Sequence, residues 1–91
     1  MKTVIVDFTG AKDFDDLHEI LMEALEFPDF YGMNTDALWD CLTGFIELPV
    51  SVVLKGLNSL PKDLDETKNR IKEAFLDAQE EGWGVYVEFE D

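Results

Sequence analysis

Residues 50–55 are Val50-Ser51-Val52-Val53-Leu54-Lys55, a run of β-branched and apolar side chains that predicts a β-strand near the middle of the chain. Gly56 and Pro61 bracket the loop that follows this strand. Two other stretches, at residues 3–8 and 84–90, are rich in similar side chains and predict two further strands. The segments between these three strands therefore decide the fold class.

Apolar residues recur at three- and four-residue steps between the strands, which predicts helices. Asp13 and Asn34 are suitable N-caps, and Gly44 and Gly82 lie near helix C-termini. The predicted helices run from Asp13 to a point before Pro28, from Asn34 to Phe45 and from Asp65 to Glu81. The order β-α-α-β-α-β favours right-handed crossovers, so we expect an α/β fold with a small three-stranded parallel sheet and helices packed on it.

The length and composition suit one small domain. The chain has 91 residues, of which 46% are hydrophobic, so we expect a single domain over residues 1–91 with a modest core. Cys41 is the only cysteine, so no intrachain disulfide can form, as is usual in a reducing cytoplasm. Neither an export signal nor an apolar stretch long enough for a membrane span is visible, and we expect a cytoplasmic protein.

Charge is the strongest compositional feature. Seven Lys and Arg against 21 Asp and Glu give a net charge of −14. Such a chain repels nucleic-acid phosphates and anionic lipid, so neither nucleic acid nor a membrane is an expected partner. Residues 13–54 hold ten acids and no Lys or Arg. The composition favours a basic protein as the partner.

The second predicted helix has a core face and an outward face when its residues are placed on a helical wheel. Asp36 and Asp40 lie on the outward face, flanked by Trp39 and Thr43. A like-charge pair at this spacing costs about 0.2 to 0.5 kcal/mol unless a cation answers it. Asp77 and Glu81 repeat the spacing near the end of the last predicted helix. The apolar residues of the core face are Ala37, Leu38, Cys41, Leu42 and Phe45. Carboxylates whose spacing destabilises their own helix suggest a surface that serves binding and not stability.

The loop before this helix contains Phe30-Tyr31-Gly32. Rigid aromatics beside carboxylates, with a glycine that lets a partner approach, are typical of a protein-binding hot spot. Each aromatic could instead be a core residue, and Asp36 and Asp40 could be plain solvated surface.

Residues 27–44, Phe-Pro-Asp-Phe-Tyr-Gly-Met-Asn-Thr-Asp-Ala-Leu-Trp-Asp-Cys-Leu-Thr-Gly, resemble the central segment of the barstar family, the intracellular inhibitors of barnase-like ribonucleases. Looser similarity extends over nearly the whole chain. The resemblance implies a three-stranded parallel sheet with helices, in agreement with the fold expected above. It also implies a function that is not enzymatic and needs no cofactor. The chain would block the active site of a basic, extracellular-type, guanyl-specific ribonuclease in a 1:1 complex, for self-protection or as an immunity protein against a toxin.

The resemblance implies roles for individual residues. Asp40 would enter the phosphate site of the nuclease in place of an RNA phosphate, and Asp36 would pair with another arginine of the cleft. Phe30 would stack on the catalytic histidine of the nuclease. The other implied contacts are Tyr31, Gly32, Asn34, Trp39, Thr43, Gly44, Asp77 and Glu81. The family pattern has tyrosine, tryptophan, glutamate and cysteine where this chain has Phe30, Phe45, Asp77 and Trp83.

Catalysis and metal binding are the less favoured alternatives. His18 and Cys41 could suggest thiol chemistry, but Cys41 lies on the predicted core face. Asp36 and Asp40 could suggest acid–base catalysis, yet adjacent turns of a convex helix offer no pocket that would shift a pKa. The stretch 13–16 lacks the glycine and the glutamate of a calcium-binding loop, so no metal is expected.

An acidic module that binds a different basic protein or toxin remains an open alternative. The direction in which the carboxylates point discriminates between the inhibitor hypothesis and the acidic-module hypothesis. Convergence of Asp36, Asp40 and Asp77 with the aromatic loop would favour the inhibitor, and dispersal would count against it.

Overall fold

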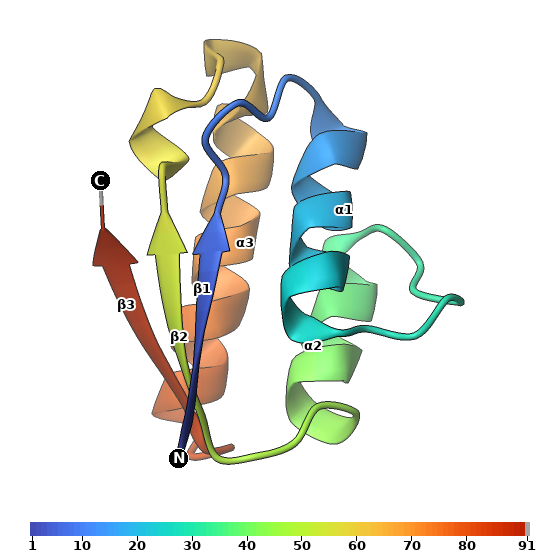
Figure 1. Cartoon of the computed structure of the whole chain (residues 1–91), viewed down its shortest axis with the longest axis vertical. Helices are drawn as coiled ribbons and strands as arrows, with labels where there is room; N and C mark the ends of the chain where they lie inside the picture. The colour runs from blue at the N-terminus through green and yellow to red at the C-terminus, as the bar shows by residue number, and fades with distance from the viewer. Residues whose placement is uncertain (91) are drawn as a thin grey trace.

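Strands and α-helices follow one another in the order β-α-α-β-α-β, so the predicted α/β class is confirmed (Figure 1). The structure is a computed structural model that describes residues 1–90. Its elements are β1 (Lys2–Asp7), α1 (Phe14–Leu25), α2 (Thr35–Gly44), β2 (Val50–Lys55), α3 (Asp65–Glu80) and β3 (Val85–Glu90). Two short 3-10 turns, Leu57–Ser59 and Lys62–Leu64, lie between β2 and α3. Asp91, the last residue of the domain expected over residues 1–91, lies outside the described residues.

The sheet has the order β1-β2-β3, and β2 pairs in parallel with both neighbours, as predicted. One row of the register joins Val4, Val52 and Val87. Val52, Val53 and Leu54 are all buried, which suits a central strand that has a neighbour on each side. The continuous apolar run near the middle of the sequence thus becomes the centre of the sheet.

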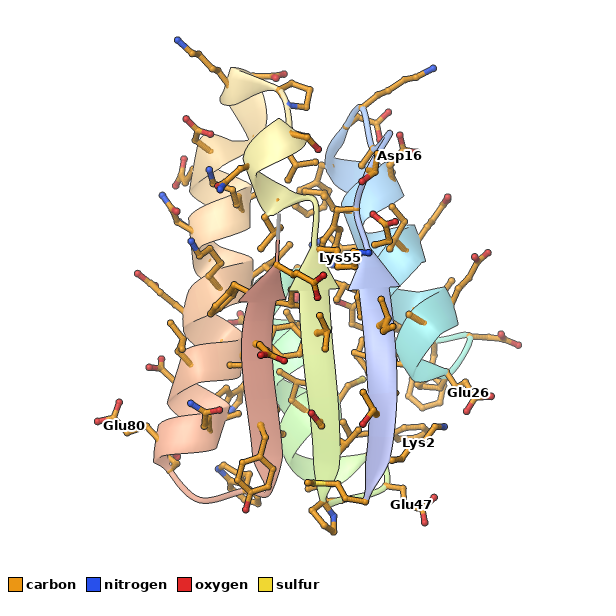
Figure 2. All side chains as sticks on the ribbon, turned by 60° about the vertical axis from the view of Figure 1, so that its left-hand side comes forward. Lys2, Asp16, Glu26, Glu47, Lys55 and Glu80 are labelled. Carbon is orange, nitrogen blue, oxygen red and sulfur yellow. The ribbon has the colours of Figure 1, made fainter. Side chains whose placement is uncertain are left out.

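The three α-helices lie on one face of the sheet and leave the other face open (Figures 1 and 2). Side chains alternate accordingly along β1, where Val4 and Val6 pack into the core and Ile5 is 60% exposed. Tyr86 on β3 is also exposed on the open face. The protein therefore has two layers, and α2 lies in the helical layer.

Both predicted N-caps are confirmed. The Asp13 carboxylate accepts a hydrogen bond from the Asp16 backbone N–H at 2.9 Å, and the Asn34 side chain accepts one from the Ala37 N–H at 2.8 Å. At the other end of the chain, Gly82 follows α3 with a φ of +83°, the left-handed conformation that glycine adopts at little cost.

The predicted core position of Phe45, at the end of the second helix, is wrong. α2 ends at Gly44, and the backbone N–H groups of Phe45 and Ile46 both donate to the Cys41 carbonyl, at 3.2 and 3.1 Å. Phe45 leaves the core face that the helical wheel assigned to it and is 52% exposed, while Ile46 packs against the core. The wheel failed here because it assumed one more helical residue.

The core lies between the sheet and the helices. His18 of α1 is fully buried there. Within residues 1–90, no helix is both long enough and apolar enough to cross a bilayer. The largest fully buried apolar side chains are Phe8, Leu17, Leu21, Leu38, Leu42, Leu54, Ile71 and Phe75.

Candidate protein-binding surface

α2 presents its acids to solvent because its other side is held in the core. Leu38, Cys41 and Leu42 are buried, whereas Asp36 and Asp40 are exposed on the opposite side. Neither aspartate is neutralised by a cation of residues 1–90 in this structure. The ion pairs found there join Lys2 to Glu26, Lys68 to Asp65 and Arg70 to Glu66.

The four-residue spacing of acids does not by itself distinguish α2. On α1, Asp15, Glu19 and Glu23 follow the same spacing and are also exposed. α2 differs in what flanks its acids, since the Trp39 and Thr43 side chains are partly buried beside them. The Thr43 hydroxyl donates to the Trp39 carbonyl at 2.8 Å, which holds the hydroxyl against the helix.

A shallow groove lies between α2 and α3 on one flank of the aspartates. Thr35 and Trp39 line it from α2, and Arg70, Glu73 and Asp77 line it from α3. Asp77 thus lies beside α2, although it is far from Asp40 in the sequence. Glu73 was not among the sequence candidates, but its place four residues before Asp77 on the same helix face could have indicated it.

Glu81 lies one turn after Asp77, at the C-cap of α3. Its carboxylate accepts a hydrogen bond from the indole N–H of Trp83 at 3.3 Å. A partner that used Glu81 would have to share or replace this bond.

The loop between α1 and α2 lies on the other flank of the aspartates. A Cβ added to Gly32 would be 3.3 Å from the Ala37 Cβ and 3.4 Å from Nδ2 of Asn34, so the loop packs closely against the start of α2 at this glycine. The same Nδ2 donates to the Gly32 carbonyl at 3.1 Å. Gly32 and Asn34 therefore join the loop to the start of α2.

The two loop aromatics point in different directions. Phe30 is 81% exposed, and its ring lies edge-on to that of Phe45 with the centroids 6.1 Å apart. Tyr31 is only 6% exposed and packs on Phe27 and His18. The contact implied for Tyr31 is therefore limited to its backbone in this conformation. Phe45 adds to the exposed aromatic area and was missed because the pattern placed it on the core face.

The aspartates stand between these two flanks. On α2 they lie between Ala37, which contacts the loop at Gly32, and Trp39, which lines the groove to α3. A Cβ added to Gly44 would meet nothing within 4 Å, so the helix end is open to a partner. We call the whole area the α2 surface, which consists of Phe30, Gly32, Asp36, Trp39, Asp40, Thr43, Gly44, Phe45 and Asp77. The aromatic loop and Asp77 thus lie on the two sides of the α2 aspartates.

Cys41 and the grouping of the acids bear on the alternatives of thiol and metal chemistry. Burial raises the pKa of the Cys41 thiol and the charge of Asp40 raises it further, so the sulfur stays protonated near neutral pH. Within the part of the chain that the structure describes, no three His, Cys, Asp or Glu side chains come together as metal ligands.

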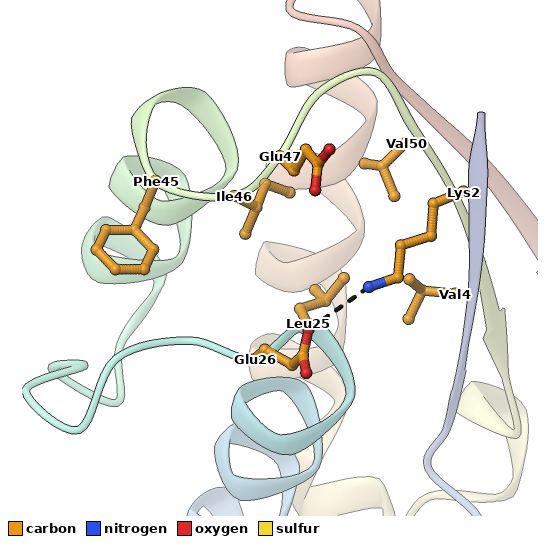
Figure 3. A pocket seen from close by; sticks show the side chains of 8 residues that line it. All are labelled: Lys2, Val4, Leu25, Glu26, Phe45, Ile46, Glu47 and Val50. Atoms are coloured by element: carbon orange, nitrogen blue, oxygen red, sulfur yellow. Dashed lines mark hydrogen bonds and ion pairs between the residues drawn. The ribbon is translucent and has the colours of Figure 1, made fainter.

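A cavity of about 140 Å³ opens where the start of β1, the end of α1 and the α2–β2 connection meet (Figure 3). Lys2 and Glu26 line it as an ion pair at 3.5 Å, with Glu47 and Phe45 nearby. Small-molecule sites are usually larger, about 300 Å³ or more. The cation of this cavity is also already paired, so the cavity offers less for recognition than the α2 surface.

Comparison with known proteins identifies the family. The family model described as "Barstar (barnase inhibitor)" matches residues 1–90. The chain belongs to the barstar family. A relative named "Putative ribonuclease inhibitor YrdF", from Bacillus subtilis (strain 168), is 41% identical over 81 residues, which cover 89% of this chain and 89% of the relative. The barstar resemblance noted at residues 27–44 is thus confirmed over residues 1–90.

Of the four residues for which the resemblance implied another side chain, Phe30, Phe45 and Asp77 belong to the α2 surface and Trp83 does not. Phe30 and Phe45, for which the resemblance implied tyrosine and tryptophan, are the two rings in edge-on contact. Trp83, which replaces a cysteine, is the residue that donates to Glu81.

Proposed function

We propose that this protein is a non-enzymatic inhibitor that forms a 1:1 complex with a basic, barnase-like, guanyl-specific ribonuclease and blocks its active site. The observation that carries the proposal is the exposure of Asp36 and Asp40, without cationic partners among residues 1–90, between the Phe30 loop and Asp77. Membership of a family described as the barnase inhibitor supports it, as does the name of the Bacillus subtilis relative.

The mechanism that we propose is steric occlusion with phosphate mimicry. Asp40 would take the position of an RNA phosphate among the cationic groups of the nuclease, and Asp36 would pair with a second cleft arginine. Charge-assisted hydrogen bonds of this kind are short and strong where water is excluded. Phe30 would stack on a ring of the nuclease, and Phe45 would support it from the side.

The remaining acids would act at long range. A net charge of −14 attracts a basic enzyme and speeds the encounter, even where individual carboxylates never touch it. We propose that the protein acts inside the cell, where it would neutralise a ribonuclease that becomes active before export or enters as a toxin.

An inhibition titration against a small panel of guanyl-specific ribonucleases tests the proposal. At least one enzyme should lose activity with an endpoint at one inhibitor per enzyme. Asp40→Ala should abolish or strongly weaken inhibition, because it strands the cationic groups of the cleft. Glu23→Ala on α1 is the matched control, since it removes the same charge from an exposed helix position outside the α2 surface.

Two results would count against the proposal. If no ribonuclease of the panel were inhibited, while another basic protein bound the α2 surface, the acidic-module alternative would replace it. If Glu23→Ala weakened inhibition as much as Asp40→Ala, the binding face would lie elsewhere.

A further inference from the structure

A buried histidine joins the aromatic loop to α1. His18, the single histidine of the chain, is fully buried, and its Nδ1 lies 2.8 Å from the hydroxyl oxygen of Tyr31. Phe14 packs on the His18 ring with the centroids 4.6 Å apart. Phe27 packs on the Tyr31 ring with the centroids 4.8 Å apart. Tyr31 directly follows Phe30, so this cluster lies next to the exposed aromatic side chain of the α2 surface.

The side-chain hydrogen bonds of the loop are few. Among the side chains of residues 27–33, Tyr31 alone makes a hydrogen bond in the described structure. The backbone bonds of the loop are local, with the Phe27 N–H donating to the Met22 carbonyl and the Tyr31 N–H to the Pro28 carbonyl, both at 2.9 Å. The direction of the neighbouring exposed ring therefore depends on where Tyr31 is held, together with the Phe45 ring and the bond from Asn34 to the Gly32 carbonyl.

A proton on His18 would have no partner in the core. Nε2 is buried without a hydrogen bond, whichever ring nitrogen carries the hydrogen in the bond to Tyr31. Burial lowers the pKa of His18, and the charge of Asp15 on the same helix opposes this only in part. The other titratable groups around the contact are the Tyr31 phenol and the Cys41 thiol of α2, whose pKa values are raised mainly by burial, so both are uncharged near neutral pH.

We infer that His18 is a positioning residue and a proton-operated switch: the neutral ring holds Phe30 in its binding direction through Tyr31, and uptake of a proton frees the loop. The consequence for ribonuclease binding rests on the proposed function. A histidine that reaches water titrates near pH 6.5, whereas the closed loop keeps His18 from water. The ratio of open to closed loops should therefore rise by up to about 30-fold between pH 7.5 and pH 5.0.

An NMR titration of the free protein tests the coupling without any partner. The chain has one histidine, so its ring signals are assigned without ambiguity. In the wild type, the His18 ring and the amides of residues 29–33 should change with a common midpoint. In Tyr31→Phe, which keeps the ring and removes the hydroxyl, the loop signals should already be shifted at pH 7.5 and should no longer follow His18. Titration of His18 with unmoved loop signals would overturn the inference, and so would a Tyr31→Phe loop that matches the wild type.

A binding series tests the consequence. The dissociation constants of wild type, Tyr31→Phe and His18→Asn are measured from pH 7.5 to 5.0 with one ribonuclease that the wild type inhibits, and circular dichroism checks that each protein is folded at each pH. The Asn amide can stand where Nδ1 stood but does not titrate. Groups that titrate on the nuclease affect both proteins alike. Their effect therefore cancels in the ratio of the dissociation constants of wild type and His18→Asn at each pH.

Tyr31→Phe should bind about three- to tenfold more weakly at pH 7.5, and the wild type should lose more affinity on acidification than His18→Asn. If the affinities of wild type and His18→Asn fell equally with pH, the inference would be overturned and the inhibitor function would stand. Absence of any inhibited ribonuclease would overturn the proposed function, and the NMR titration would still decide the loop coupling. If His18→Asn does not fold, Tyr31→Phe and the NMR titration suffice.

Discussion

Neutralising Asp40 should make the free protein more stable and a poorer inhibitor. Asp40 is exposed on α2, has no cationic partner among residues 1–90 and stands one turn after Asp36. Removing the repulsion between two like charges at this spacing stabilises a helix by about 0.2 to 0.5 kcal/mol. In a domain of this size 1 kcal/mol moves Tm by about 4 to 8 °C, so Asp40→Asn should raise Tm by about 1 to 4 °C.

The same substitution should weaken binding. Removing a carboxylate that meets cations in a desolvated cleft costs about 2 to 5 kcal/mol of binding free energy. This corresponds to a rise in Kd of about 30-fold to several thousand-fold. Opposite signs for stability and affinity are the expected signature of a side chain that serves the complex and not the fold.

Glu23→Gln is the control for both measurements. It removes one charge from α1 and relieves a like-charge pair with Glu19, so its Tm should rise by a similar amount. Its Kd should change by less than about threefold, since only long-range attraction is reduced. The assays are thermal unfolding followed by circular dichroism at about 0.01 M and about 0.5 M salt, where the gain in Tm should shrink with screening, and inhibition kinetics.

Two outcomes would refute this reasoning. A lower Tm for Asp40→Asn would mean that the carboxylate makes a stabilising contact within the fold. Equal losses of affinity in Asp40→Asn and Glu23→Gln would mean that total charge, and not the α2 surface, governs binding.

Four further measurements follow from the structure. Leu38→Ala should lower the free energy of unfolding by about 2 to 5 kcal/mol in denaturant titrations, since it leaves a cavity at a fully buried position; a loss below about 1 kcal/mol would contradict that burial. Cys41 should react slowly with a thiol reagent at neutral pH and quickly once the protein is unfolded, because burial raises the pKa of its thiol; equal rates would contradict a buried sulfur. The pKa of His18 is lowered in the folded state, so the unfolded chain takes up the proton first as the pH falls below about 6.5, and the stability of the wild type relative to His18→Asn should decline there and stay constant above it. The association rate with a basic ribonuclease should fall steeply as salt rises from about 0.01 to about 0.5 M, and indifference to salt would rule out steering.

Local patterns were sufficient for most of the fold. The strand at residues 50–55 could be predicted because its run of β-branched and apolar residues is typical of a central strand. The caps Asp13 and Asn34 were correct because each bonds a backbone group three residues away, and both partners are visible in the sequence. Phe45 was misplaced because the exact helix end depends on how the last turn closes on Cys41.

The candidate surface was predictable only in part. The spacing of Asp36 and Asp40 indicated an acidic face, yet Asp15, Glu19 and Glu23 on α1 have the same spacing, so spacing alone could not select the helix. The flanking Trp39 and the preceding Phe30-Tyr31-Gly32 loop indicated the second helix, and the family resemblance then implied its partner. The resemblance did not indicate that the Trp83 indole donates a hydrogen bond to Glu81, because that contact depends on the turn between α3 and β3.

By itself the sequence determined the elements, their parallel order and the negative charge of the chain, because these follow from periodicity, from short-range capping and from composition. Tertiary structure alone decided which of two adjacent aromatics faces solvent. Phe30 points outward and Tyr31 inward because the Tyr31 hydroxyl meets the buried His18 ring, a partner thirteen residues away on another element. In the same way, Asp77 lies beside α2 only because α3 packs against it. Contacts between distant elements are long-range consequences of packing one core, and no local pattern contains them.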